Sequence, residues 1–197
     1  MSTQPKTYLT PEQYLEIERK AEFKSEYYQG EMFAMAGARW AHNLILLNLA
    51  SELRQQLRSR PCSVTSSDMR VRVNAKGLYT YPDVVVVCGE PQFLDERRDT
   101  LLNPTLIVEV LSESTEQYDR GRKFEHYRPL ESLAEYLLVS SERVSVERYT
   151  RQPDGSWNYI AKASLEDSLD LPSVGCHLAL ADLYEKVDFS PPEPAAG

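Results

Sequence analysis

The stretches Tyr81–Val87, YPDVVVV, and Leu106–Leu111, LIVEVL, are two apolar runs that each carry one acid. Short runs rich in valine, isoleucine and leucine are typical of strands that are buried on both faces of a sheet. Asp83 stands at the entrance of the first run, where it could simply be a turn residue, and Glu109 lies in the middle of the second. The two runs therefore predict neighbouring core strands with an acid on each.

The second acid is the more informative one. The alternation of a strand places Glu109 on the same face as Ile107 and Leu111. A buried carboxylate is costly unless it shifts its pKa, pairs with a core arginine or binds a cation. If Asp83 and Glu109 lie side by side, they repel each other unless a divalent cation sits between them. Oxygen ligands of this kind favour Mg²⁺ or Mn²⁺ over zinc.

Outward from these strands, the pattern predicts helices and a hairpin first and a strand-rich part later. Thr10, Pro11 and Gln13 form a helix start with a capping box, and Gly30 suits the turn of a hairpin over residues 26–33. The remaining predicted segments are a helix over 40–57, strands over 63–73, 79–87, 104–111, 135–139, 144–149 and 157–161, a turn over 74–77, a loop over 90–103, and helices over 119–128 and 179–187.

The longest predicted helix has its apolar residues at helical spacing. Trp40, Leu44 and Leu47, followed by the pair Leu53 and Leu57, recur at helical spacing. With strands before and after a helix, the order of elements predicts an α/β fold, a mixed β-sheet flanked by helices. The length fits one domain over residues 1–189, followed by a proline-rich, flexible C-terminal tail over 190–197.

Composition restricts the class of protein further. The net charge is −8, which argues against a protein that coats itself in nucleic acid, but a metal site itself needs carboxylates. Cys62, Cys88 and Cys176 form no CxxC pair, and we expect three free thiols, as in the reducing cytoplasm. The apolar runs are too short to cross a membrane, and the first residues lack the core of a signal peptide. These features predict a cytoplasmic protein without a membrane partner.

The ordered set of motifs resembles the PD-(D/E)XK nuclease superfamily and, more narrowly, a large bacterial family described as putative restriction endonucleases. The resemblance runs from about Thr10 to Tyr149 and rests on Tyr28–Glu31, His42, Tyr81–Val84, Asn103–Pro104, Glu109–Ser112, Ser114–Thr115, Asp119, Lys123, Tyr127 and Glu135–Tyr136. It implies a restriction-endonuclease-like fold and a Mg²⁺-dependent (or Mn²⁺-dependent) endonuclease that hydrolyses phosphodiester bonds of DNA. It also implies a homodimer, because the superfamily often works as dimers.

The resemblance assigns roles to particular residues. Asp83 and Glu109 would bind the metal, with the main-chain carbonyl of Val110 as a third ligand. Glu31 is the residue that matches the acid near the first core helix of the superfamily, although a surface hairpin glutamate has the same sequence appearance. His42, on the long helix, is a further catalytic candidate that a satisfied structural histidine would equally explain.

One departure concerns the catalytic lysine. The superfamily pattern places a lysine two residues after Glu109, and this chain has Leu111 there. The resemblance implies that Lys123, on the following helix, supplies the amine, whereas a solvated cluster with Arg120 and Arg122 is the alternative. Candidate contacts to nucleic acid are exposed arginines, of which Arg54 and Arg58 share one helix face. The full set is Arg54, Arg58, Arg60, Arg70, Arg72, Arg120 and Arg122.

Two other functions remain open at this point. The missing lysine at position 111 and the acidic charge favour a catalytically weak or inactive nuclease fold that acts as a nucleic-acid-binding or interaction module. A metal-dependent hydrolase of a small phosphorylated substrate is the other alternative, and a narrow pocket without a basic rim would favour it.

Overall fold

The computed structural model of the 197-residue chain describes residues 8–73, 77–112 and 116–190. Five α-helices, one π-helical turn (η1) and thirteen strands are assigned within these ranges. They are α1 Pro11–Glu18, β1 Ser25–Tyr28, β2 Glu31–Ala34, α2 Trp40–Gln56, β3 Cys62–Ser66, β4 Arg70–Arg72, β5 Leu78–Thr80, β6 Val84–Cys88, β7 Thr100–Leu101, β8 Leu106–Leu111, α3 Glu116–Tyr118, η1 Asp119–Lys123, α4 Phe124–Tyr127, β9 Glu135–Ser140, β10 Val146–Arg151, β11 Trp157–Lys162, β12 Ser168–Leu171, β13 Cys176–Ala179 and α5 Leu180–Leu183.

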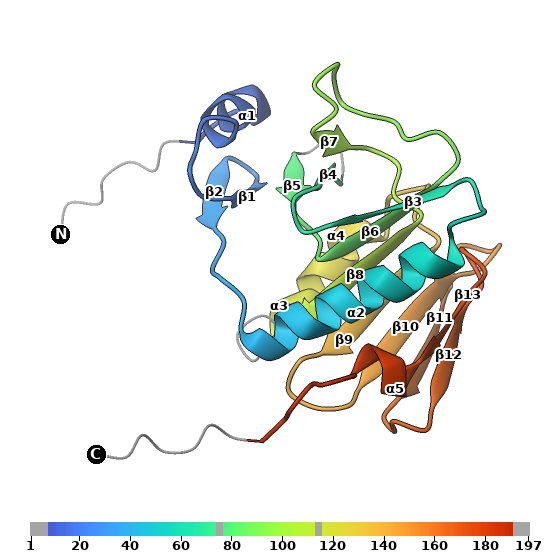
Figure 1. The fold of residues 1–197 in the computed structure, drawn as a ribbon. Helices are drawn as coiled ribbons and strands as arrows, with labels where there is room; N and C mark the ends of the chain where they lie inside the picture. The colour runs from blue at the N-terminus through green and yellow to red at the C-terminus, as the bar shows by residue number, and fades with distance from the viewer. Residues whose placement is uncertain (1–7, 74–76, 113–115, 191–197) are drawn as a thin grey trace, which may run out of the picture.

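A mixed six-stranded sheet forms the centre, in the order β11-β10-β9-β8-β6-β3. The pair β8–β9 is parallel, and the other neighbouring pairs are antiparallel. α2 crosses one face of this sheet, and α3, η1 and α4 lie behind the other face (Figure 1). The predicted α/β fold, a mixed sheet flanked by helices, is therefore confirmed.

Alternation along the central strands supplies both helical layers with apolar side chains. Val84, Val86 and Val108 belong to the core cluster beneath α2. Val85 and Ile107 point the other way and pack in the cluster that contains the aromatic residues of α4 and β9. The burial of these runs on both faces explains why they are continuously apolar.

A second sheet of five short strands, in the order β2-β1-β5-β4-β7, packs beside α1 (Figure 1). Its β1–β2 hairpin turns at Gln29 and Gly30, whose φ angles are 46° and 95°. Both central residues of a tight hairpin turn adopt positive φ, which glycine tolerates best. The predicted hairpin is confirmed, and the predicted capping box at Thr10 and Gln13 also starts α1.

Two predicted single strands are each divided between the two sheets. The segment 79–87 contributes β5 to the five-stranded sheet and β6 to the six-stranded sheet, with Tyr81–Asp83 as the crossing. The segment 63–73 is divided in the same way into β3 and β4. Pro82 has no N–H to donate to a ladder, so it interrupts strand pairing at the first crossing. Both strand predictions were too long for this reason.

The apolar residues whose spacing predicted α2 do not all face the core. The residues that pack on the sheet are Ile45, Leu49, Leu53 and Leu57, each at most 2% exposed. Trp40 and Leu47 point away from the core and are 77% and 64% exposed. The helix carries apolar residues on two opposite stripes, and periodicity alone does not say which stripe meets the sheet.

The C-terminal part differs more from the prediction. The hairpin β12–β13 precedes α5, and α5 is shorter than the predicted helix over 179–187. Earlier in the chain, β7 lies in the segment 90–103 that was predicted as a loop. Residues 74–76 of the predicted turn, Ser114–Thr115 of the motif set and residues 191–197 of the predicted tail lie outside the described residues. None of the helices in the described ranges has the length and hydrophobicity that a membrane crossing requires.

The prediction of three free thiols is wrong. Cys62 and Cys88 are paired residues on the antiparallel strands β3 and β6, and their sulfur atoms form a disulfide. Cys176 is the free thiol, and it is buried. Strand register, which brings together cysteines that are far apart in the sequence, is not visible in their spacing. The argument from free thiols to a reducing compartment therefore no longer holds.

Candidate active site

The two predicted acids lie on neighbouring segments, Asp83 directly before β6 and Glu109 within β8. β6 pairs with β8, and Val84 lies opposite Val108. Continuing this antiparallel register by one residue brings Asp83 opposite Glu109, and opposite residues point to the same face. An Asp83 carboxylate oxygen, Oδ2, accepts a 2.7 Å hydrogen bond from the Val110 N–H, which ties the crossing to β8. The predicted neighbourhood of the two strands is confirmed.

The Lys123 ammonium points toward the acids, as predicted. Its Nζ lies 3.0 Å from Glu109 Oε1, 3.4 Å from Asp119 Oδ1 and 3.6 Å from Glu26 Oε1. The residue is 7% exposed, so the alternative of a solvated basic cluster does not apply to it. Asp119 begins and Lys123 ends the π-helical turn η1, and both are buried. Such turns are frequent at functional sites.

Tyr127 lies one turn after Lys123 and also contacts Glu109. It is fully buried, and its hydroxyl donates a 2.8 Å hydrogen bond to Glu109 Oε1. Tyr127 therefore packs on the inner side of the helix. The same Glu109 oxygen thus receives both the ammonium and the phenol, which fixes the orientation of the carboxylate.

Glu26 is a site residue that sequence reasoning missed. It lies on β1, next to Lys123, and its Oε1 also accepts a hydrogen bond from the Thr80 hydroxyl. Glu31, which was expected in this place, begins β2 opposite Tyr28. Among the described residues, the hairpin carboxylate that contacts Lys123 is that of Glu26. Strand alternation within the hairpin did not distinguish the two glutamates, because Glu26 shares the face of Tyr28 and Glu31 lies opposite Tyr28.

His42 reaches the site from the other face of the sheet. Its Nε2 lies 3.3 Å from Asp83 Oδ2, and its side chain is 13% exposed. Its Nδ1 is buried and has no hydrogen-bond partner among the described residues. The position at the start of α2 therefore places an imidazole against the metal-ligand candidate Asp83. Its catalytic role stays a prediction, as does the role of the Val110 carbonyl.

Burial and charge act together on the central pair. Burial raises the pKa of the Glu109 carboxyl well above its ordinary value, and the negative charges of Asp119 and Asp83 raise it further. Burial by itself lowers the pKa of Lys123, but the three surrounding carboxylates outweigh this effect and hold that pKa well above its ordinary value. One ammonium thus lies among more acids than it can neutralise.

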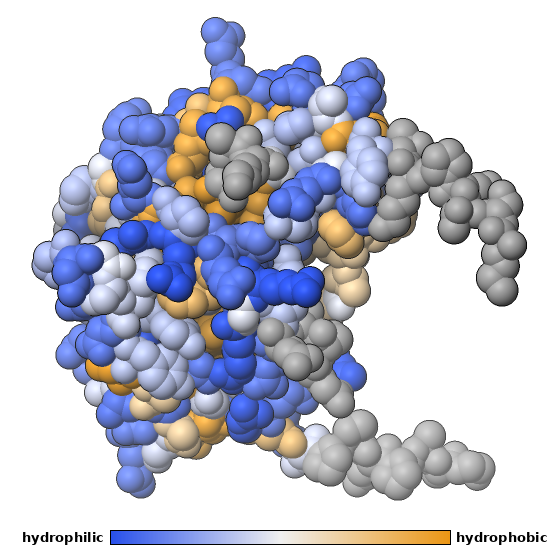
Figure 2. Space-filling view, turned by 180° about the vertical axis from the view of Figure 1, so that it is seen from behind, coloured by the Kyte–Doolittle hydropathy of each residue, from blue (hydrophilic) through white to orange (hydrophobic). Residues whose placement is uncertain are grey.

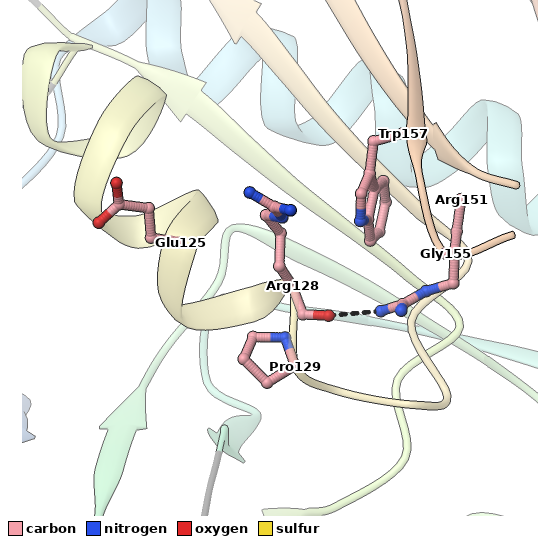
Figure 3. Close-up of a pocket in the computed structure, with 6 residues that line it drawn as sticks. All are labelled: Glu125, Arg128, Pro129, Arg151, Gly155 and Trp157. Carbon is pink, nitrogen blue, oxygen red and sulfur yellow. Dashed lines mark hydrogen bonds between the residues drawn. The ribbon is translucent and has the colours of Figure 1, made fainter.

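Two surface grooves lie away from these acids. One, of about 300 Å³, lies between α4 and the β10–β11 hairpin and is lined by Glu125, Arg128, Pro129, Arg151, Gly155 and Trp157 (Figure 3). There, Arg151 donates a 2.6 Å hydrogen bond to the Arg128 carbonyl. The other lies between α2 and β3. Neither lining includes a residue of the acid cluster, so neither supplies the narrow substrate pocket that a small-substrate hydrolase would favour.

Several arginines that were candidates for nucleic-acid contact serve the fold instead. Arg60 donates to the carbonyls of Val174 and Gly175. Arg120 pairs with Glu116 and Glu147. Arg54, Arg58 and Arg122 are exposed. Arg54, Arg58 and Arg122 therefore remain candidates for contact with nucleic acid.

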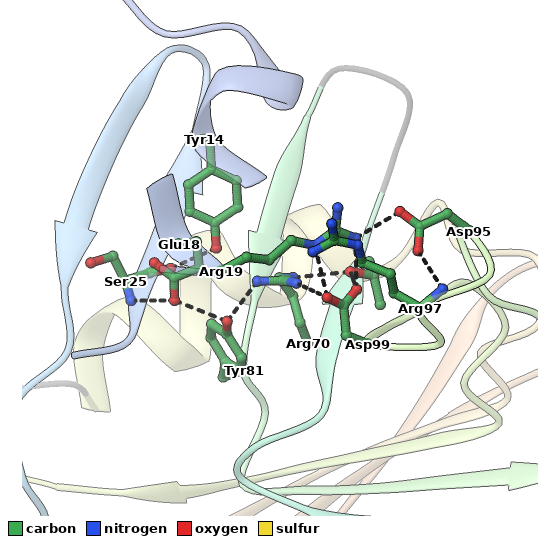
Figure 4. Close-up of polar contacts among 10 residues, drawn as sticks. Tyr14, Glu18, Arg19, Ser25, Arg70, Tyr81, Asp95, Arg97 and Asp99 are labelled. Carbon is green, nitrogen blue, oxygen red and sulfur yellow. Dashed lines mark hydrogen bonds and ion pairs between the residues drawn. The ribbon is translucent and has the colours of Figure 1, made fainter. Parts of the chain in front are cut away.

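Arg70 belongs to a buried network between α1 and the crossing toward β6 (Figure 4). Its guanidinium donates to the Tyr81 hydroxyl at 2.8 Å, and this hydroxyl donates to Glu18 Oε1 at 2.9 Å. The same Glu18 oxygen accepts the Ser25 N–H at 2.9 Å. Ser25 directly precedes Glu26, and Tyr81 lies two residues before Asp83. The network therefore anchors β1, which carries Glu26, and the crossing that carries Asp83.

The other end of this network binds the loop before β7. Arg19 donates to both carboxylate oxygens of Asp99, at 2.8 and 2.9 Å, and to Asp95 at 2.6 Å. Arg70 adds a 3.1 Å contact to Asp99. The Arg19 side chain holds the pKa of Asp99 down to about 2, although burial acts in the opposite direction.

A mixed sheet with helices on both faces and acids at a strand end is the arrangement of restriction-endonuclease-like proteins. A solved structure with this fold is a putative nuclease belonging to DUF820 from Anabaena variabilis, which superimposes with a TM-score of 0.72. The match covers 89% of this chain and 97% of that chain at 18% identity, and at this identity it shows the fold.

The family is shown by the sequence comparison. Residues 11–181 match the family Uma2, described as "Putative restriction endonuclease", and the chain belongs to that family. Two relatives from Synechocystis sp. are the uncharacterized proteins slr1290 and sll1609. The first is 37% identical over 92% of this chain and 94% of its own, and the second 40% identical over 76% and 84%. The resemblance inferred from the motifs is confirmed.

Proposed function

We propose that this protein is a divalent-metal-dependent endonuclease that hydrolyses phosphodiester bonds of DNA. The observation that carries the proposal is the set of three carboxylates around one ammonium: those of Glu109, Asp119 and Glu26 lie 3.0 to 3.6 Å from Lys123 Nζ. Asp83 adds a fourth acid across the strand pair. The family description and the fold support the same class of reaction.

The excess of negative charge is the argument for a cation. Buried carboxylates in excess of their counter-charge must take up protons or bind a metal. Among the described residues, no three His, Cys, Asp or Glu side chains converge as a complete metal site. Mg²⁺ does not require three such side chains, since it is usually held by one or two carboxylates together with water and substrate phosphate. Asp83 and Glu109 therefore fit it, with the Val110 carbonyl as the proposed third ligand.

A bound Mg²⁺ would polarise the phosphodiester and lower the pKa of the attacking water. The residues of the chain have separate tasks. Asp83 and Glu109 hold the cation, and Tyr127 and the Val110 N–H fix these two carboxylates in place. Lys123 presents a positive charge where negative charge develops on the phosphate oxygens. In the reaction, a water oxygen bonds to phosphorus, the bond to the leaving sugar oxygen breaks, and that oxygen takes up a proton.

Leu111 does not argue against catalysis in this arrangement. Its side chain is 2% exposed and packs in the apolar cluster behind the strands. The ammonium of Lys123 lies beside Glu109 instead, which supports its use in place of the usual lysine. The competing proposal, a nuclease fold kept for binding without cleavage, predicts no hydrolysis with any metal.

The deciding experiment compares wild type with Asp83→Asn. Purified proteins are incubated with supercoiled plasmid, linear DNA and RNA, in Mg²⁺, Mn²⁺ or chelator. We expect the wild type to nick or linearise the plasmid in the presence of metal and the variant to be inactive. Absence of cleavage by the wild type in every metal would favour the alternative proposal, a nuclease fold kept for binding without cleavage. Equal cleavage by both proteins would indicate a contaminating nuclease and remove the assigned site.

A further inference from the structure

The face of the β1–β2 hairpin that carries Glu26 also carries an exposed aromatic ring. Glu26 lies opposite Phe33 in this antiparallel pair, and opposite residues point to the same face of a sheet. Tyr27 and Met32 alternate to the other face, where they pack in the cluster that contains Tyr14 of α1. Phe33 is 48% exposed. An aromatic ring that water still reaches therefore lies beside an acid of the candidate active site.

A second exposed ring lies on the helical side of Glu26. Tyr118 ends α3, directly before Asp119, and it is 38% exposed. Partial burial raises the pKa of Tyr118, and the negative charge of Glu26 raises that pKa further. The influence of Glu26 means that the phenol lies near this carboxylate, and the raised pKa keeps the phenol neutral. Phe33 and Tyr118 therefore border the same acid, one from the hairpin and one from the helical layer.

Neither of these two rings is covered by another aromatic side chain. Tyr28, on the same face of the hairpin, contacts His126 with 4.7 Å between the ring centroids. Within residues 8–73, 77–112 and 116–190, Phe33 and Tyr118 make no comparable ring contact. The surface opposite α2 is mostly hydrophilic (Figure 2). Exposed rings beside functional acids are therefore exceptions that a ligand can use.

From this arrangement we infer that the protein recognises DNA with unpaired bases, which stack on Phe33 and Tyr118 beside the scissile phosphate. The inference rests on the proposed nuclease function and adds the form of its substrate. An unpaired base has a free π-face that stacks on aromatic side chains, whatever its sequence. In a duplex, the neighbouring base pairs cover these faces. A phenylalanine ring has no donor for a phosphate, so it gains contact energy from a base and not from the backbone.

The distribution of charge favours the same substrate. Binding to duplex DNA depends on lysine and arginine side chains that neutralise phosphates. The net charge of this chain is −8. Of the arginines considered for nucleic-acid contact, Arg60, Arg70 and Arg120 already bind groups of the protein itself. Stacking on Phe33 and Tyr118 supplies affinity that does not depend on free positive charge.

Fluorescence anisotropy of labelled oligonucleotides in Ca²⁺ tests recognition separately from cleavage. The probes are a single strand of mixed sequence, its duplex, and a strand of the same length whose central nucleotides lack bases. We expect the wild type to bind the single strand at least about tenfold more tightly than either other probe. Phe33→Ala and Tyr118→Ala should each weaken this binding by about tenfold, whereas Tyr118→Phe keeps the ring and should bind like the wild type.

Tyr159→Ala is the matched control, because Tyr159 is 51% exposed on β11, three strands away from β8. This variant should bind the single strand like the wild type. Melting temperatures show whether each variant is folded. Equal binding of the single strand, the duplex and the strand without bases overturns the inference. Binding of the single strand that neither Phe33→Ala nor Tyr118→Ala weakens also overturns it.

A cleavage assay in Mn²⁺ distinguishes this inference from the proposed function. A duplex with an unpaired bubble should be cut at the bubble at least about tenfold faster than the fully paired duplex. Phe33→Ala and Tyr118→Ala should lose this preference. Cleavage of both duplexes at the same rate overturns the inference and leaves the nuclease function intact. Selective binding of the unpaired strand without cleavage in any metal would support the recognition and contradict the proposed hydrolysis.

Discussion

Lys123 Nζ lies 3.0 Å from Glu109 Oε1, and both side chains are almost fully buried. The lysine comes from a π-helical turn and the glutamate from a central strand, so the pair joins the helical layer to the sheet. The Lys123 ammonium therefore lies beside the Glu109 carboxylate, although the lysine is not at the usual position two residues after this glutamate. The pair links the stability of this part of the fold to the chemistry proposed for it.

Lys123→Ala should lower the rate of DNA cleavage by about 10²–10³, since one preorganised donor at a developing charge is lost. Metal affinity should stay unchanged or rise slightly, because a competing positive charge is removed. Lys123→Arg should restore little activity, since a planar guanidinium does not replace a compact ammonium. Plasmid nicking with Mn²⁺ measures the rate, and Lys186→Ala, at a lysine whose side chain is 80% exposed, is the control. Near-normal cleavage by Lys123→Ala would show that the amine is dispensable.

Glu26→Gln should reduce cleavage by about 10²-fold or more, because the variant removes one of the charges that orient Lys123. Glu31→Gln is the matched control on the same hairpin, and we expect a much smaller effect from it. Initial rates at saturating metal compare the two. A larger loss of cleavage in Glu31→Gln than in Glu26→Gln would indicate that Glu31, not Glu26, is the hairpin acid that acts in the site.

Metal binding should depend on Asp83 and Glu109 together. Calorimetric titration with Mn²⁺ should show binding to the wild type, and Asp83→Asn or Glu109→Gln should weaken it by at least about tenfold, since hard cations require anionic oxygen ligands. Glu90→Gln, an exposed acid outside the cluster, serves as the control. Equal Mn²⁺ affinity in wild type and both site variants would exclude this pair as the metal ligands.

Low pH should weaken the ion pair between Arg19 and Asp99 that holds the loop before β7. The pKa of Asp99 is about 2 in the folded protein, below its ordinary value of 3.8. A depressed carboxyl pKa contributes stability that is present above pH 3.8 and is lost as the pH falls through 2. With its partial exposure taken into account, we expect about 1–2 kcal/mol. Urea unfolding between pH 5 and pH 2 should show a smaller acid-induced loss in Asp99→Asn than in wild type, and parallel losses would contradict the assignment.

Tyr81→Phe should destabilise the fold by about 1–3 kcal/mol, because Arg70 and Glu18 each lose a buried hydrogen-bond partner. Tyr159→Phe removes a hydroxyl from a side chain that is 51% exposed and should have little effect. Thermal or urea unfolding compares the two variants. Equal stability of Tyr81→Phe and wild type would mean that the network does not hold the crossing.

Local patterns predicted the elements that carry the acids. The apolar runs around Asp83 and Glu109 identified two neighbouring core strands, and the pattern over residues 119–128 identified the helical segment that carries Lys123. These signals are local, because a buried strand and an amphipathic turn each leave a period in the sequence. The fold class followed from the order of those elements.

Long-range pairing explains what the sequence did not reveal. Glu26 joins Lys123 only because the β1–β2 hairpin belongs to a second sheet, and no local period distinguishes it from Glu31. Cys62 and Cys88 meet because β3 and β6 are in register. On α2, two apolar stripes compete, and the choice depends on the sheet beneath the helix. Each of these outcomes is set by tertiary contacts and not by neighbours along the chain.

The placement of Glu26 in the five-stranded sheet and of Asp83 and Glu109 at the end of the six-stranded one has a consequence for synthesis. During translation, Glu26 leaves the ribosome long before Lys123 and Tyr127, which complete the cluster. A nascent or truncated chain that ends before η1 carries the acids without the lysine that organises them. Under the proposed function, the protein cannot cut the genome of the cell that makes it until both sheets have docked.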